Sequence, residues 1–229
     1  MHRWIRSGIV VLALIACLAT TPSRAAVINV QFSGSLQSIP GVLAGTFSTG
    51  QAFSGRYSYD TASPRIPTSN PDWAGYAYVD FSLNIGSLTF AATGTPGPFI
   101  TNAIQILDGV GGFDTYTVSA SGFAGGPIVV DGLTAMIARL QLTSAGNPLP
   151  GGANLPAAAP VLADYGFTRQ ISVLFRPDPN SIADQVTLFG TVSAIGPTAV
   201  PEPGSLALLL VGIGSLALLH RRSARRRPG

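Results

Sequence analysis

Apolar side chains at every second position recur through the middle of this chain, and this spacing is the feature that most restricts its fold. Successive side chains of a β-strand point to opposite faces, so a period of two gathers the apolar residues on one face. The pattern covers residues 28–32, 53–59, 77–85, 88–92, 116–120, 171–175 and 186–192. Clusters of Gly, Pro, Asn and Asp separate these stretches, and no helix-length periodic segment lies between them. The pattern therefore predicts an all-β fold, an antiparallel β-sandwich or jelly-roll-like domain.

Residues 133–142 are compatible with two structures. Leu133, Met136, Ile137 and Leu140 have the spacing of one face of a helix. Gly132 and the threonines that flank the segment give a helix no support, so we expect a strand here.

The C-terminal segment, residues 200–229, has the composition of a membrane anchor. An uncharged apolar run at residues 206–219 is followed by a basic tail made of Arg221, Arg222, Arg225, Arg226 and Arg227. A helix over residues 204–220 would be roughly 25 Å long, against about 30 Å for a hydrocarbon core, and is marginally long enough to span it. We expect a single transmembrane helix at about residues 204–220 with its arginines retained in the cytoplasm; the alternative is a buried helix of a soluble domain.

The N-terminal segment, residues 1–25, has the plan of a secretory signal peptide. Arg3 and Arg6 precede an apolar stretch at residues 9–19, and a polar region ends with small residues at Ser23 and Ala25. We expect cleavage after Ala25, because cleavage after Ala26 would place Arg24 in a small-residue position. A second interpretation is a lipobox at residues 14–17, which would make Cys17 a lipidated N-terminus.

The charges divide the chain into a signal peptide (1–25), an ectodomain (26–199) and a C-terminal segment (200–229). All thirteen basic residues are arginines, and eight of them lie in the two terminal segments. The ectodomain keeps five arginines against nine aspartates, which leaves it at minus four. The basic isoelectric point thus comes from the ends of the chain, and nucleic-acid binding by the ectodomain loses its support.

The ectodomain lacks the side chains that many enzymes require. Residues 26–199 contain no cysteine, histidine, lysine or glutamate. Nucleophiles activated by histidine, and zinc or copper sites of the usual ligands, are therefore excluded. We expect a non-enzymatic protein without a cofactor. An aspartate-only hydrolase remains as an alternative, although no aspartate pair is marked by sequence as acid and nucleophile.

Two sets of ectodomain residues could bind a ligand. Asp108 and Asp114, which flank three glycines, could present oxygen ligands to calcium, or could simply belong to a glycine-rich hairpin turn. Trp73, Tyr76 and Tyr78 could form a stacking platform for sugar rings if alternation exposes Tyr76 and Tyr78 together. The alternative for these aromatics is that they close the end of the core.

The C-terminal segment resembles the PEP-CTERM sorting signal of Gram-negative bacteria. The resemblance rests on Pro201, Glu202 and Pro203, a small-residue step at Gly204 and Ser205, the short apolar span and the terminal arginine cluster. It implies that Pro201, Glu202 and Pro203 are recognised by exosortase, an integral-membrane transpeptidase resembling cysteine proteases. The two prolines suit this role because they hold the motif extended. A stiff linker between domain and membrane is the alternative.

Two ectodomain stretches resemble a common group of PEP-CTERM ectodomains with no assigned activity. They are residues 50–60 (GQAFSGRYSYD) and 108–116 (DGVGGFDTY). Together, residues and resemblance predict an exported surface or matrix protein processed by exosortase and associated with exopolysaccharide or biofilm. The alternatives are a carbohydrate- or calcium-binding module and a secreted hydrolase.

Overall fold

The computed structural model describes residues 26–66, 70–93, 102–146 and 152–198 of the 229-residue chain. These residues form twelve β-strands and two short 3-10 helices, η1 (Gly41–Leu43) and η2 (Leu162–Asp164), and none of them is α-helical. The strands are β1 (Val27–Ser38), β2 (Ala52–Asp60), β3 (Arg65–Ile66), β4 (Trp73–Tyr76), β5 (Asp80–Ile85), β6 (Leu88–Thr93), β7 (Ala103–Val110), β8 (Phe113–Ser121), β9 (Val129–Val130), β10 (Leu133–Ala145), β11 (Thr168–Arg176) and β12 (Val186–Pro197). The prediction of an all-β domain is confirmed for this part of the chain.

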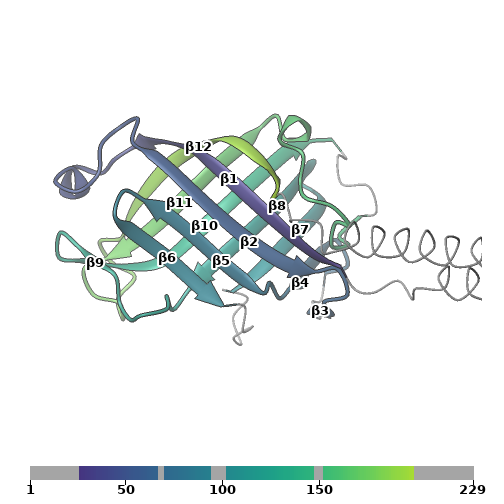
Figure 1. The fold of residues 1–229 in the computed structure, drawn as a ribbon, viewed down its shortest axis with the longest axis horizontal. Coiled ribbons are helices and arrows are strands. Elements are labelled where there is room, and N and C mark those ends of the chain that lie inside the picture. The colour runs from purple at the N-terminus through teal and green to yellow at the C-terminus, as the bar shows by residue number, and fades with distance from the viewer. Residues whose placement is uncertain (1–25, 67–69, 94–101, 147–151, 199–229) are drawn as a thin grey trace, which may run out of the picture. The chain divides into compact units, whose positions relative to one another are not determined.

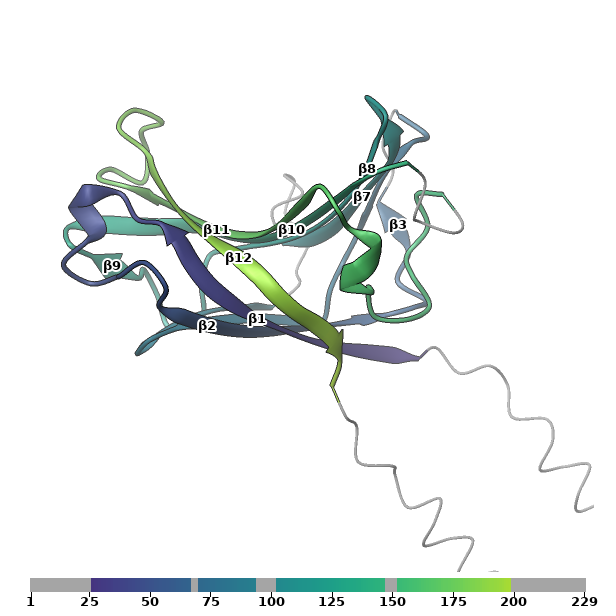
Figure 2. The ribbon, with the colours of Figure 1, turned by 90° about the horizontal axis from the view of Figure 1, so that it is seen from above.

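All strands belong to one continuous sheet in which every pair is antiparallel. Its order is β3-β4-β7-β8-β10-β11-β12-β1-β2-β5-β6, and β9 pairs with β10 beside this path. The sheet bends so that its two halves face each other, as Figure 1 and Figure 2 show. The layered arrangement agrees with the predicted sandwich, but the layers are two halves of one hydrogen-bonded sheet rather than separate sheets.

The strand nearest the C-terminal segment lies in the middle of this sheet. β12 pairs with β11 on one side and with β1 on the other. Its end, Pro197, lies opposite Val30, so the first and last strands of the domain are neighbours. Among the described strands, β12 alone pairs both with the half of the sheet that contains β1 and with the half that contains β11.

Aromatic side chains fill the space between the two halves of the sheet. Phe32 on β1 lies 6.2 Å from Phe81 on β5, measured between ring centroids. Tyr57 on β2 contacts Tyr116 on β8 across the core at 6.3 Å. Because these side chains are buried, the alternation read from the sequence corresponds to the core face of β1, β2, β5 and β8.

Glycine is required where β1 crosses its neighbours at close range. A Cβ at Gly34 would lie 1.9 Å from the backbone oxygen of Thr191 on β12, and one at Gly55 would lie 2.2 Å from the ring of Phe32. Gly34 also follows a register irregularity between β1 and β12. The backbone at Gly34 therefore lies closer to β12, and the backbone at Gly55 closer to the Phe32 ring, than a Cβ at either position would permit.

The segment at residues 133–142 is a strand, as expected, and a β-bulge explains its helix-like spacing. The register of β10 against β11 shifts between Ala135 and Ile137. Ala135 is buried before the bulge, and Ala138 and Leu140 are buried after it. The one inserted residue shifts the buried apolar positions from odd to even residue numbers. The resulting spacing of apolar residues in the sequence resembles that of a helix.

Candidate functional site

The two aspartates predicted to form a loop site lie beside each other at the end of the β7–β8 hairpin. Val110 pairs with Phe113 across the turn, and the register shifts between Leu107 and Val110. The extra residue at this bulge brings Asp108 and Gly109 opposite Asp114, whose Oδ1 accepts a hydrogen bond of 2.6 Å from the Gly109 amide. The glycines of the turn adopt positive φ angles, which permits so tight a reversal.

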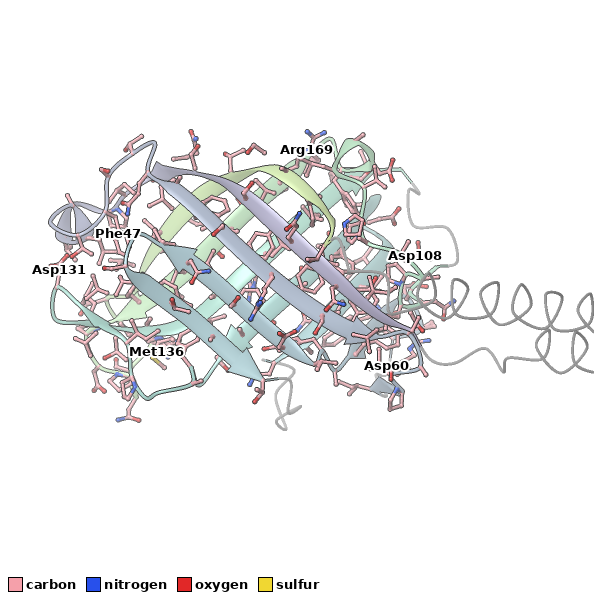
Figure 3. All side chains as sticks on the ribbon, viewed as in Figure 1. Phe47, Asp60, Asp108, Asp131, Met136 and Arg169 are labelled. Carbon is pink, nitrogen blue, oxygen red and sulfur yellow. The ribbon has the colours of Figure 1, made fainter. Side chains whose placement is uncertain are left out.

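Asp114 is completely buried. Its exposed fraction is 0%, and its second carboxylate oxygen, Oδ2, has no hydrogen-bond partner. Asp108 is half-buried, and Figure 3 shows it at the end of the domain that also carries Asp60 and Arg169. The hairpin therefore holds one carboxylate inside the core and a second one at its surface.

The electrostatic environment of Asp108 is negative. Desolvation raises the pKa of Asp108, and the negative charges of the neighbouring carboxylates of Asp114 and Asp72 raise it further. A backbone hydrogen bond holds Asp72 beside Asp108: the carbonyl of Asp72 accepts a 2.9 Å hydrogen bond from the amide of Asp108. The nearby guanidinium of Arg65 donates instead to the carbonyls of Pro71 and Trp73.

Asp72 is a member of this site that the sequence did not indicate. It lies thirty-six positions before Asp108, in the turn that leads into β4, and it joins the hairpin only because β4 pairs with β7. A correct prediction of that strand pair would have been needed to find it. Within the described ranges, no set of three acidic, histidine or cysteine side chains is arranged around a common metal position.

A segment without strands closes the core next to the hairpin. The hydroxyl of Tyr76 donates to the carbonyl of Ala153, and that of Tyr59 donates to the carbonyl of Ala158, each at 2.9 Å. Tyr165 follows η2 and is 3% exposed. Burial, with smaller contributions that include the charges of Asp164 and Asp114, raises the pKa of Tyr165. The hydroxyl groups of Tyr59 and Tyr76 therefore anchor this segment to β2 and β4.

The expected exposure of Tyr76 and Tyr78 together is wrong. Tyr76 is 5% exposed and Tyr78 is 2% exposed, whereas Trp73 is partly buried. The chain leaves β4 at Tyr76 and enters β5 at Asp80 in the other half of the sheet, so the alternation is interrupted and Val79 becomes exposed instead. The stacking platform for sugars is thus not formed by these side chains, which close the core.

The sorting residues predicted from sequence lie outside the described residues. They are Pro201, Glu202 and Pro203, the arginines of the tail, Cys17 and the cleavage position after Ala25. Comparison by sequence does reach the C-terminal segment, and residues 199–227 match the family model of the PEP-CTERM protein-sorting motif. The chain carries a PEP-CTERM sorting motif.

The PEP-CTERM motif implies export, a membrane-anchored stage in transit, and exosortase as the processing partner. The match covers the C-terminal segment and leaves the ectodomain unassigned. No curated protein and no solved structure matches the chain. In the ranges that the structure describes, no helix has the length and apolar composition that a membrane span requires.

Proposed function

We propose that this chain is an exported, non-enzymatic surface or matrix protein that exosortase recognises at Pro201, Glu202 and Pro203 and processes near them. The observation that carries the proposal is the PEP-CTERM match at residues 199–227. In this role the signal peptide at residues 1–25 starts export, and a helix at about residues 204–220 with its arginine tail holds the chain in the membrane. The domain between them is the part that reaches the surface.

The described domain supports delivery as a folded unit. Its core is built within residues 26–198, and the last strand ends at Pro197, four residues before Pro201. A processing enzyme that acts in the C-terminal segment would therefore release the whole sheet. Association of the released protein with exopolysaccharide belongs to the same proposal.

Mass spectrometry of the chain in a host with and without exosortase tests the processing step. With exosortase, the surface form should lack Arg221 and every residue after it; without exosortase, the membrane form should keep them. Glu202→Ala should leave the unprocessed form in the membrane, whereas Thr198→Ser, which changes a neighbouring residue outside the motif, should be processed normally. A surface form that retains the arginine tail would refute processing.

Fractionation tests the association with polysaccharide. The processed protein should co-purify with exopolysaccharide from wild-type cells and should appear free in the medium of cells unable to synthesise it. Equal release from both strains would exclude this part of the proposal and leave the processing step intact.

A further inference from the structure

Asp114 poses a physical problem that export does not explain. It is the single charged side chain among the fully buried residues of the described ranges, and only one of its two carboxylate oxygens accepts a hydrogen bond. An ionised carboxylate inside a protein costs several kcal/mol unless a positive charge or several hydrogen bonds compensate it. The charges that act on its neighbour Asp108 are those of Asp114 and Asp72, both negative.

Two arrangements can compensate this carboxylate. In the first, Asp108 is protonated and donates to Oδ2 of Asp114, which neutralises one charge of the pair. In the second, a cation lies between the two carboxylates. The second arrangement gives the unpartnered Oδ2 of Asp114 a positive partner, and a divalent cation can accept both carboxylates as ligands.

We propose that the hairpin end formed by Asp108 and Asp114 is a calcium site, with Asp72 at its rim. The oxygen Oδ2 of Asp114 is the buried ligand that has no other partner, and Asp108 supplies a second carboxylate. The proposal is independent of processing by exosortase, because it concerns only the ectodomain.

The ligand chemistry selects calcium among common cations. The ectodomain has no histidine or cysteine, so the imidazole and thiolate ligands that transition metals usually take are absent. Two carboxylates on an irregular hairpin suit Ca²⁺, which accepts variable coordination and completes its shell with backbone carbonyls and water. Mg²⁺ requires near-octahedral geometry and gives up its water reluctantly. With so few acidic ligands, the affinity belongs in the range of extracellular modules, Kd of about 0.1–1 mM.

Calorimetry and thermal unfolding of the full chain, purified in detergent, test the site. Titration with CaCl₂ should give saturable heat for one ion per chain, and about 10 mM Ca²⁺ should raise Tm by about 3 °C or more. The same ionic strength supplied as NaCl should have no such effect. Absence of saturable heat together with an unchanged Tm would overturn the proposal.

Asp108→Asn distinguishes a specific site from general attraction of cations. The variant keeps the shape of the side chain and provides an amide donor for Oδ2 of Asp114, so the protein should remain folded, with a calcium-free Tm above that of the wild type. It should bind Ca²⁺ at least about tenfold more weakly. Asp184→Asn, an equal change of charge at an exposed position in the β11–β12 loop, should keep the affinity within about twofold. Equal losses in both variants would show that no calcium site exists at the hairpin.

Discussion

Gly34→Ala should destabilise the domain strongly, because the new methyl group has no space between β1 and β12. Its Cβ would lie 1.9 Å from the Thr191 carbonyl oxygen and 2.6 Å from the ring of Phe53, whereas ordinary contact begins near 3.4 Å. The strands would have to separate by roughly 1.5 Å, which exceeds the tolerance of a ladder hydrogen bond. Overpacking costs about 1–3 kcal/mol, and each hydrogen bond lost adds about 1 kcal/mol.

The expected loss is therefore about 3 kcal/mol of unfolding free energy, or about 6–12 °C in Tm for a domain of this size. Urea unfolding followed by tryptophan fluorescence measures it as a lower midpoint with an unchanged m-value. Gly196→Ala is the matched control, since it lies in the same strand pair and its Cβ would meet nothing within 4 Å. Its stability should stay within about 0.5 kcal/mol of the wild type. If Gly34→Ala unfolds at the same urea concentration as Gly196→Ala, the close approach of β1 and β12 is wrong.

Three further predictions concern the hydroxyl groups of buried tyrosines, the pH dependence of stability through Asp108, and the arginines of the C-terminal segment. Tyr59→Phe removes the hydrogen bond to Ala158 and should cost about 1 kcal/mol, whereas Tyr78→Phe removes a buried hydroxyl without a partner and should leave stability unchanged or higher; urea midpoints in the opposite order would contradict the assignment of these hydroxyls. The raised pKa of Asp108 means that the folded chain holds a proton that the unfolded chain has released, so the contribution of this group to stability is full below the ordinary value of 3.8 and is lost as pH rises through the folded pKa. Without calcium, Asp108→Asn should therefore flatten the decline in Tm as pH rises above about 4, and a slope equal to that of the wild type would exclude the raised pKa of Asp108. Replacement of the five tail arginines by glutamine should weaken retention of the tail in the cytoplasm; a protease added outside spheroplasts should then remove a C-terminal epitope that it spares in the wild type, and continued protection would argue against the anchor.

The local features of the fold could be predicted from sequence, because a period of two depends only on neighbouring positions. The stretches that became β1, β2 and β8 bury the residues that alternation indicated, among them Phe32, Tyr57 and Tyr116. The prediction failed at residues 77–79, where the apolar pattern continues although the backbone passes from one half of the sheet to the other. Hydropathy carries no signal for such a crossing.

The candidate hairpin site was predictable in part for the same reason. Asp108 and Asp114 are close in sequence and flank a glycine turn, so their meeting required only a hairpin. The complete burial of Asp114 and the approach of Asp72 depend on pairings between distant strands. Neither can be obtained from spacing along the chain.

The central position of β12 has a consequence for the order of events during export. A chain that has emerged only as far as β11 has two separate groups of strands, β1-β2-β5-β6 and β3-β4-β7-β8-β10-β11. The edge strands β1 and β11 of these groups both lack their partner β12. β12 joins them, and it is the last strand of the domain to leave the translocation channel before the Pro-Glu-Pro sequence follows. The end of β12 and the start of the Pro-Glu-Pro sequence are thus separated by only a few residues of translocated chain. If exosortase cleaves the chain as proposed, cleavage after that arrival would act on a chain whose strands are all present, and the released part would be a whole sheet rather than an aggregation-prone fragment.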